Sequence, residues 1–468
     1  MNANINALEE SAKGLAMCII EQEQIAVIHH YDADGIASGA IIIKALQSIG
    51  KQVAHRGIKQ LYTETIEELK GLSSFFVFTD FGSSHIKELE KAFGNQFVVI
   101  DHHQPKYPRS ENFLNCWHFG INGTIEASGA ALAYLVAKHI SEDNCLAPLA
   151  IIGAVGDMQD SNEGLLGLNR EILLEASESK LIEAKLDLRL YGRFTRPLVQ
   201  FLTYSTDPII PNLTGNEENC ARFLMERGFE LKEDERWLCY EDLSYEEKQK
   251  LATELIVYMR SLDVPEWKIA RLIGEVYTLL NEPIGPLRDA KEYATLLNAC
   301  GRNNAIDLGL AVCLGDRNEK YSKALELLAE HRRKLREGLQ LIAEEGLQEA
   351  KNFYYFNAGK RIKDSLIGVI AGMLYSSAVI SNEKPIVAFA EQEDGFVKVS
   401  ARATQELVTK GLNLGKIMQE CCSALGGKAE GGGHQIAAGA RIAGESLESF
   451  LMLFDKKVEE QLKKVYQS

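Results

Sequence analysis

Four short clusters of aspartate and histidine carry the residue types that could do chemistry in this chain. Three of them close apolar runs that are typical of buried strands, at 24–30, 74–80 and 96–101. We predict that the apolar run at 147–157 is a fourth strand that ends in its own cluster. The carboxyl ends of parallel strands open into one crevice, so the clusters should converge although they lie far apart in sequence. The clusters are HHYDADG at 29–35, TDFG at 79–82, DHH at 101–103 and GDMQ at 156–159.

A convergence of so many acidic side chains needs positive charge. Crowded carboxylates repel one another and take up protons unless cations neutralise them. Imidazoles beside carboxylates, with no cysteine among them, favour Mn²⁺ over Mg²⁺. The number of ligands suits two divalent ions, which together would polarise a phosphoryl group and activate water. The candidate residues are Asp32, Asp34, Asp80, Asp101, His102, His103 and Asp157.

Each cluster also has a plainer interpretation. A single aspartate after a strand most often caps the next helix, and a pair of histidines is usually structural. The Asp-X-Asp-Gly pattern also occurs in turns and calcium loops, but residue 43, where a calcium loop needs its closing glutamate, is isoleucine. Four clusters at the ends of successive predicted strands favour one shared site over four separate caps.

The four clusters resemble motifs I to IV of the DHH phosphoesterase superfamily, which includes RecJ exonucleases, oligoribonucleases and family II inorganic pyrophosphatases. A glycine-rich stretch, GGGH at 431–434, is similar to the signature of the DHH-associated C-terminal domain. Stretches such as LRLYGRFTRPL and GPLRDAKEYATLLNACGR extend the resemblance over essentially the whole chain. In these features the sequence looks like the archaeal RecJ-like proteins of the GINS-associated nuclease type.

In motifs I, II and IV the resemblance implies metal ligands. Many members place a ligand histidine four residues before the first aspartate of motif I, but that position is Ile28 here. His30 is the candidate replacement in the shell of the first ion. The implied carboxylate ligands are Asp32 for one ion, Asp34 for the other, and Asp80 and Asp157 for both.

The resemblance also implies residues that meet the substrate. His102 would be the motif III metal ligand, with Asp101 supporting it as an acceptor, while His103 would contact the scissile phosphate. Arg402, at the end of a predicted strand, would bind substrate phosphate with its planar fork. Glycines let a backbone approach a phosphate closely, and a neighbouring histidine adds a donor. The residues of this signature are Gly431, Gly432, Gly433 and His434.

A basic segment leads out of the region that carries the motifs. If it is helical, its cations form one stripe, because they are spaced by four, four and three residues. A charge run of this kind is usually a solvated helix face, and contact with a nucleic-acid backbone is the functional alternative. The residues are Lys185, Arg189, Arg193 and Arg196.

The pattern of elements predicts an α/β protein in three parts. Strands alternate with helices over 1–195, which predicts a parallel-sheet metal domain. Helices dominate 196–350, an insertion or connector, and the smaller C-terminal part at 351–468 returns to an α/β pattern as the DHH-associated substrate-binding domain. The turn residues at 393–395 predict a hairpin between two strands of that last part.

Composition sets outer limits on the function. The chain has 468 residues and a formal net charge of −15, which disfavours binding of nucleic acid or membranes by the whole surface. We expect no transmembrane helix, because no window of about 18 apolar residues exists. We expect no secretory signal, because the first residues have no basic region and carry two glutamates before their apolar run. Nine scattered cysteines fit reduced thiols in a cytoplasmic protein.

From these features we expect a metal-dependent exonuclease. The resemblance to the archaeal RecJ-like proteins implies that it hydrolyses single-stranded DNA, with RNA as a further candidate substrate, to mononucleotides from the 5′ end, in DNA replication or repair. A single strand would be held inside one cleft, so an acidic outer surface does not argue against it. Two alternatives remain open: an oligoribonuclease or cyclic-dinucleotide phosphodiesterase, and a replisome scaffold subunit bound to a GINS-type partner.

Overall fold

The computed structural model describes residues 3–141, 144–160, 164–205, 207–376, 383–427 and 429–464. Contacts divide the chain into two compact units, 1–328 and 329–468, and each is described by itself. The division into three parts at 195 and 350 remains a proposal. No helix among the described residues is both long and apolar enough to cross a membrane.

The first unit is built on a parallel sheet, as predicted. Its strands follow the order β2-β1-β3-β4-β5, and every neighbouring pair is parallel. Helical crossovers connect β1 to β2, β2 to β3 and β3 to β4, because parallel neighbours cannot be joined by a tight turn. The strands are β1 (Ile25–His30), β2 (Val53–Ile58), β3 (Phe75–Thr79), β4 (Phe97–Ile100) and β5 (Phe113–Leu114).

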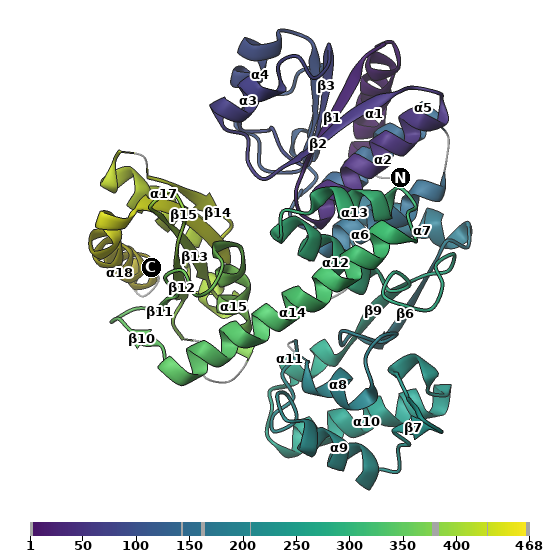
Figure 1. Ribbon diagram of the computed structural model, residues 1–468, viewed down its shortest axis with the longest axis vertical. Coiled ribbons are helices and arrows are strands. Elements are labelled where there is room, and N and C mark those ends of the chain that lie inside the picture. Colours follow the sequence, from purple (N-terminus) through teal and green to yellow (C-terminus); the bar gives the residue numbers. More distant parts are fainter. Residues whose placement is uncertain are drawn as a thin grey trace. The chain divides into compact units, whose positions relative to one another are not determined.

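Both faces of this sheet are covered by apolar side chains. Along β1, Ile25 and Val27 join the larger core cluster, whereas Ala26 and Ile28 join the cluster on the opposite face. This alternation follows from the two-residue period of a strand. Figure 1 shows helices on either side of the sheet. The larger core contains α1 (Ala3–Ile20), α2 (Ala33–Ser48), α5 (Gly129–Ser141) and α7 (Gly167–Glu178), and the other face carries α3 (Thr63–Leu69) and α4 (Ile86–Phe93).

The apolar run at 147–157 is a helix, so the prediction of a strand was wrong. Helix α6 (Ala147–Gly156) begins with a proline in its first turn and packs against α2, α5 and α7. Nearly all of its side chains are buried, so it has no polar face to show a helical period. A continuous apolar run cannot by itself distinguish a buried strand from a buried helix.

A two-stranded antiparallel ribbon, β6 (Ile182–Leu188) with β9 (Ile273–Leu279), leads to a lobe with its own apolar core between Leu188 and Ile273 (Figure 1). After β9 the chain returns to the larger core of the unit through α12 (Ala290–Arg302) and α13 (Ile306–Cys313). The lobe contains α8 (Leu198–Thr203), α9 (Glu217–Glu226), α10 (Tyr245–Ser261), α11 (Glu266–Ile269), β7 (Lys232–Glu233) and β8 (Arg236–Trp237).

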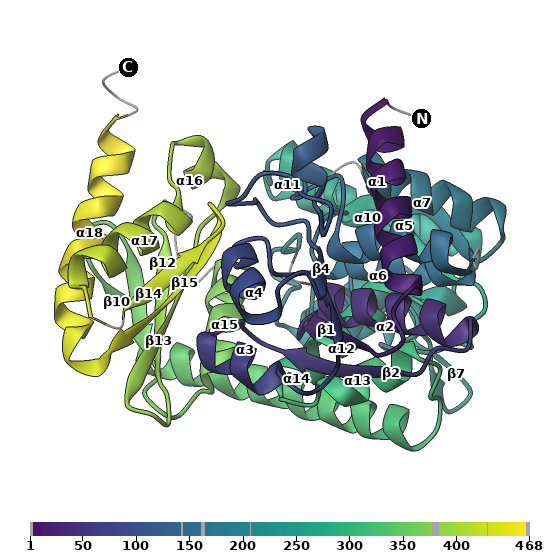
Figure 2. The same ribbon diagram turned by 90° about the horizontal axis from the view of Figure 1, so that it is seen from above.

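The second unit is a mixed sheet in the order β10-β11-β12-β13-β15-β14, entered through the long helix α14 (Glu319–Glu345). The pair β11 and β12 is parallel and the other pairs are antiparallel. β12 and β13 form the hairpin predicted at 393–395. Helices α17 and α18 pack on one face of this sheet (Figure 2) and α15 packs on the other. The elements are β10 (Gln348–Glu349), β11 (Tyr354–Asn357), α15 (Asp364–Ser376), β12 (Ile386–Glu391), β13 (Phe396–Arg402), α16 (Gln405–Thr409), α17 (Leu414–Leu425), β14 (Glu430–Gly433), β15 (Ala437–Ala443) and α18 (Leu447–Lys464).

Candidate metal centre

Three of the four acidic clusters lie at the carboxyl ends of parallel strands. His30 ends β1, Asp80 follows β3 and Asp101 follows β4. The fourth cluster lies at the same site but on a different kind of element, because Asp157 caps the carboxyl end of the helix α6. The four clusters therefore converge as predicted, but one of the four elements that carry them is a helix.

One group of candidate ligands forms around the end of β1. The Nδ1 atom of His30 lies 3.0 Å from Oδ2 of Asp32 and 3.4 Å from Oδ2 of Asp80. Asp32 caps α2, and its Oδ1 atom accepts from the amide of Gly35 at 3.0 Å. The same aspartate is thus both a helix cap and a candidate ligand. Ile28, at the position where a motif I histidine was expected, is fully buried in the apolar core.

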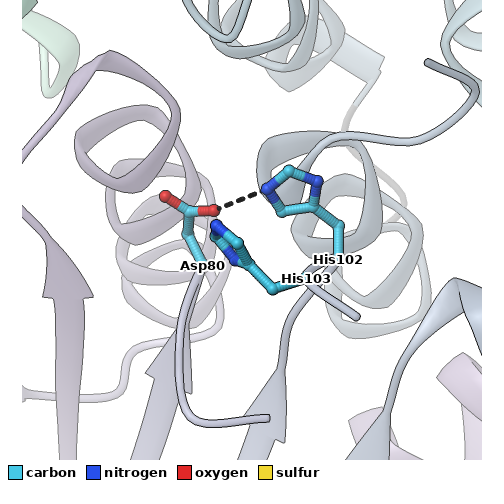
Figure 3. A group of neighbouring side chains, drawn as sticks. All are labelled: Asp80, His102 and His103. Atoms are coloured by element: carbon cyan, nitrogen blue, oxygen red, sulfur yellow. Dashed lines mark ion pairs between the residues drawn. The ribbon is translucent and has the colours of Figure 1, made fainter. Parts of the chain in front are cut away.

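A second group forms around His102. Its Nε2 atom lies 3.2 Å from Oδ1 of Asp80, 3.7 Å from Oδ2 of Asp34 and 3.9 Å from Oδ2 of Asp157. Asp80 therefore places one oxygen beside each group, which is the geometry of a bridging ligand. Figure 3 shows His102 directed at this carboxylate, with His103 beside them.

The ring of His102 has a defined orientation. Its Nδ1 atom lies 2.6 Å from the carbonyl oxygen of Gly123, which can only accept, so Nδ1 carries the hydrogen. The Nε2 lone pair of the neutral ring then faces three carboxylates. Such an arrangement is repulsive unless a cation lies between them or the ring is protonated. The donor set therefore fits a divalent ion.

The ionisation of the centre supports the same conclusion. Burial and the nearby carboxylate of Asp80 raise the pKa of Asp34 well above its ordinary value. Burial opposes protonation of His102, yet the surrounding aspartates raise its pKa well above the ordinary value. Against the same opposition from burial, Asp32 and Asp80 raise the pKa of His30. Without a metal ion these side chains hold protons, and a divalent cation would replace those protons.

Backbone amides at the amino end of α5 position the carboxylate of Asp34. Its two carboxylate oxygens accept from the amides of Gly129 at 2.7 Å and Ala130 at 2.9 Å. Glycine is required nearby for space: a Cβ at Gly153 would lie 2.4 Å from Oδ1 of Asp34, and one at Gly129 would lie 2.7 Å from Oδ1 of Asp80. Two glycines on separate helices thus make room for the acidic centre.

Asp101 supports His103, not His102 as expected. Its Oδ1 atom lies 2.8 Å from Nδ1 of His103, and its Oδ2 atom accepts from the amide of Ser83 at 2.8 Å. Although burial disfavours its charged form, His103 holds the pKa of Asp101 below its ordinary value. Within the described residues, Asp101 belongs to none of the groups with metal-ligand spacing. The side chain of His103 is 41% exposed, so this ring lies at the surface of the centre.

The expected phosphate-binding residues lie in the second unit. Gly431, Gly432 and Gly433 form part of the edge strand β14, not a loose turn, and the amide of His434 donates to Ala437 at 2.8 Å. Arg402 ends β13 and lies against α15, where a Cβ at Gly368 would come 2.6 Å from its Nη2 atom. Their contact with substrate phosphate stays a prediction.

The basic segment is not a helix, so the predicted stripe was wrong. Lys185 lies within the strand β6, and Arg189 follows it and pairs with Asp160 at 2.8 Å. Arg193 is only 1% exposed. It pairs with Asp187 at 3.3 Å, Asp289 at 3.4 Å and also Glu241.

This burial removes Arg193 as a contact for a nucleic-acid backbone. Arg196 lies over the rings of Tyr191, at 4.6 Å, and Tyr204, at 5.0 Å. For Lys185, Arg189 and Arg196, backbone contact stays a prediction.

Sequence reasoning missed several residues that position the centre. Gln159 is buried and donates to Asp157 at 2.8 Å and to the carbonyl of Gly123 at 2.9 Å. Asn298, on α12, accepts from the amide of Ala33 at 3.1 Å and so holds the start of α2. The position of Gln159 within the GDMQ cluster was the only feature of the sequence that pointed to it. Nothing in the sequence pattern connects Asn298 with motif I across 265 positions.

Three family models match the chain. The N-terminal domain of the DHH family matches residues 24–155, the DHH-CID domain matches 190–273 and the DHHA1 domain matches 352–460. The acidic centre lies within or next to the first match, and the glycine-rich strand lies within the last.

The chain is similar in sequence to two kinds of protein. It is 31% identical over 474 residues to the uncharacterized protein MJ0831 of Methanocaldococcus jannaschii, covering 99% of this chain and all of that protein. It is 26% identical over 186 residues to the single-stranded-DNA-specific exonuclease RecJ of Bacillus subtilis, covering 36% of this chain and 24% of the exonuclease. The match to the bacterial exonuclease thus spans about a quarter of that enzyme's length.

Solved structures show the same fold. RecJ from Thermus thermophilus in complex with Mn²⁺ superposes with a TM-score of 0.59 at 17% identity, over 97% of this chain and 55% of that one. CDC45 from Entamoeba histolytica superposes with a TM-score of 0.63 at 14% identity, over 97% of this chain and 99% of that one. One fold is therefore shared with an exonuclease and with CDC45.

Proposed function

The chain belongs to the DHH phosphoesterase superfamily and has a RecJ-like fold, and we propose on this basis that it is a metal-dependent exonuclease. Its substrate would be single-stranded DNA, with RNA as a further candidate, and its products would be mononucleotides released from the 5′ end. Replication or repair in the cytoplasm is the expected setting, and nine free cysteines fit a reducing compartment.

One observation carries this proposal: Asp80 places an oxygen beside each of two groups of candidate ligands. The first group is His30, Asp32 and Asp80, and the second is Asp34, His102 and Asp157, which a third group of Asp80, His102 and His103 overlaps. Their donor atoms are oxygen and imidazole nitrogen, which suits Mn²⁺ better than Mg²⁺. Two bound ions would supply charge stabilisation at a phosphodiester and a nucleophile at neutral pH. A scaffold protein that had lost these ligands could not hold two ions.

The surrounding residues have separate tasks in this proposal. Asp101 accepts from Nδ1 of His103 and, against the opposing effect of burial, raises the pKa of that ring, so that the protonated ring can donate from Nε2 to a phosphate oxygen. Gln159 fixes Asp157 and Gly123 with one amide group. In the second unit, Arg402 and the glycine-rich strand β14 would bind substrate phosphates away from the reacting bond.

A second candidate role, as the docking platform for a GINS-type replisome partner, falls to the helical insertion at 196–350, which contains most of the lobe that the DHH-CID model matches at 190–273. The likeness to CDC45 supports this idea at the level of the fold. The lobe has its own apolar core and exposes the large side chains of Trp237 and Trp267. Such a scaffold role does not exclude catalysis, because the acidic centre is intact. Partner binding in a pull-down should be lost when the lobe is disrupted, whereas retained binding would place the interface elsewhere.

A digestion series tests the proposed activity. End-labelled single-stranded DNA and RNA are each incubated with Mn²⁺ and with Mg²⁺, and the label shows the polarity. Release of mononucleotides should disappear in the variants Asp34→Ala and His103→Ala. Wild-type rates in both variants would contradict the site. A cyclic dinucleotide or a short RNA hydrolysed in preference to the long strand would support the small-substrate phosphodiesterase instead.

A further inference from the structure

The edge of the metal centre carries an apolar side chain that the proposed chemistry does not use. Met158 directly follows the candidate ligand Asp157 and is 77% exposed. Its φ angle is 61°, in the left-handed region that residues with a side chain rarely adopt. Strained backbone of this kind persists where the surrounding structure imposes it, and it is common at functional sites.

The loop around Met158 is firmly held. Successive amides bond back to α6: Asp157 to Gly153 at 2.9 Å, Met158 to Val155 at 3.1 Å and Gln159 to Ala154 at 2.9 Å. The next side chain, Gln159, is buried and also bonds to Asn169 at 2.7 Å. The exposure of Met158 is therefore a defined feature of the fold and not a frayed helix end.

A second exposed apolar side chain lies on the loop that orients His102. Ile125 is 41% exposed, and it is two residues from Gly123, whose carbonyl receives both His102 and Gln159. The loops that carry Met158 and Ile125 are thus joined by one hydrogen-bonded carbonyl. Two exposed apolar side chains therefore lie on loops that adjoin each other beside the acidic centre.

We propose that Met158 determines specificity by packing against the base of the nucleotide whose phosphate occupies the metal centre, with Ile125 flanking the same base. This inference rests on the proposed function. The adjacent charged centre would bind the phosphate, so an apolar surface one residue away meets the part of a nucleotide that is flat and weakly polar. A flexible thioether packs on any base face, so the contact would distinguish a base from its absence without selecting among the four bases.

The experiment compares two single-stranded DNA substrates with Mn²⁺. They are identical except that the nucleotide to be released is normal in one and abasic in the other. Wild-type protein should release the normal nucleotide about 10-fold faster than the abasic one. Met158→Ala should slow release of the normal nucleotide about 5- to 10-fold and leave the abasic rate unchanged, which removes the difference.

Two further variants control for folding and for exposure. Met158→Gly relieves the left-handed backbone while removing the same contact, so it should fold at least as well and show the same loss of discrimination. Met225→Ala removes another methionine, 59% exposed on α9, and should match wild type on both substrates.

Equal slowing on both substrates, or no slowing on either, would overturn the role of Met158. In that case wild-type turnover would still support the proposed exonuclease. If wild-type protein hydrolysed neither strand, the proposed function would fail, and this inference would fail with it.

Discussion

The imidazole of His102 donates from Nδ1 to the carbonyl oxygen of Gly123, at 2.6 Å. The same oxygen accepts from Nε2 of Gln159 at 2.9 Å, and that amide also reaches Asp157 at 2.8 Å. One backbone carbonyl therefore connects the candidate ligands of motifs III and IV. Because groups that orient ligands tune metal affinity, mutations at Gln159 should act on the metal without removing any ligand.

We predict that Gln159→Met lowers the affinity for Mn²⁺ by roughly 10- to 100-fold. Methionine fills a similar volume but cannot hold Asp157 or the Gly123 carbonyl. Isothermal titration with Mn²⁺ measures the effect directly. Gln249→Met, in which an exposed glutamine of α10 is changed, is the matched control and should bind Mn²⁺ like wild type. An unchanged affinity in Gln159→Met would show that this amide does not position the ligands.

Asp101→Asn should separate metal binding from turnover. An asparagine oxygen can still accept from His103, but the negative charge is lost and the amide end cannot accept from the backbone of Ser83. We expect turnover of single-stranded DNA to fall about 10- to 100-fold while the affinity for Mn²⁺ changes less than about 3-fold. A parallel loss of Mn²⁺ affinity would instead make Asp101 part of the metal shell.

Gly129→Ala should disrupt the centre by steric conflict. The new Cβ would lie 2.7 Å from Oδ1 of Asp80, a side chain that is almost wholly buried. We expect weaker Mn²⁺ binding and a loss of unfolding free energy of about 1–3 kcal/mol. Gly14→Ala is the control: nothing lies within 4 Å of its added Cβ, so it should stabilise helix α1 by up to about 1 kcal/mol. Calorimetric unfolding of both variants measures the contrast.

The sequence predicted the positions of residues for which it carries a local pattern. His30, Asp80 and Asp101 could be located because apolar runs with turn residues after them define the ends of parallel strands. The motif pointed to Asp157, which lies near Asp34 and His102, although the element that carries it is a helix and not the predicted strand. Its apolar run is buried on all sides, so the periodicity that separates helix from strand is absent.

Tertiary partners could not be predicted in the same way. The spacing of the basic residues at 185–196 matches a helix, but pairing of β6 with β9 overrides it. That pairing joins segments about 90 positions apart, and no local pattern encodes it. Likewise, Asp101 bonds to His103 and not to His102 because the Gly123 carbonyl already accepts from the ring of His102, and the sequence does not encode that contact.

Arg193→Met should reveal a buried charge cluster that supports the fold. The side chain of Arg193 is 2% exposed and pairs with Asp187, Glu241 and Asp289, which lie on three separate segments. Removing it leaves buried carboxylates short of a counter-charge, and we expect a loss of about 3–5 kcal/mol in unfolding free energy. Arg236→Met, at a 57% exposed surface ion pair, should cost less than about 1 kcal/mol. Similar losses in the two variants would contradict a structural role for the Arg193 cluster.

Whether His30 replaces the motif I histidine can be tested by measuring how many Mn²⁺ ions the protein binds. Ile28 lies wholly in the apolar core, whereas His30 lies beside Asp32 and Asp80, so His30 should complete one of two ion sites. We expect wild-type protein to bind two Mn²⁺ ions and His30→Ala to bind one tightly. Saturation of a site at 100 times its dissociation constant stabilises the fold by about 2.7 kcal/mol, so the rise in Tm with Mn²⁺ should shrink in this variant. His55→Ala, at an exposed position of β2, should retain both ions. Two tight ions in His30→Ala would show that His30 is no ligand, and one ion in wild type would rule out a two-ion centre.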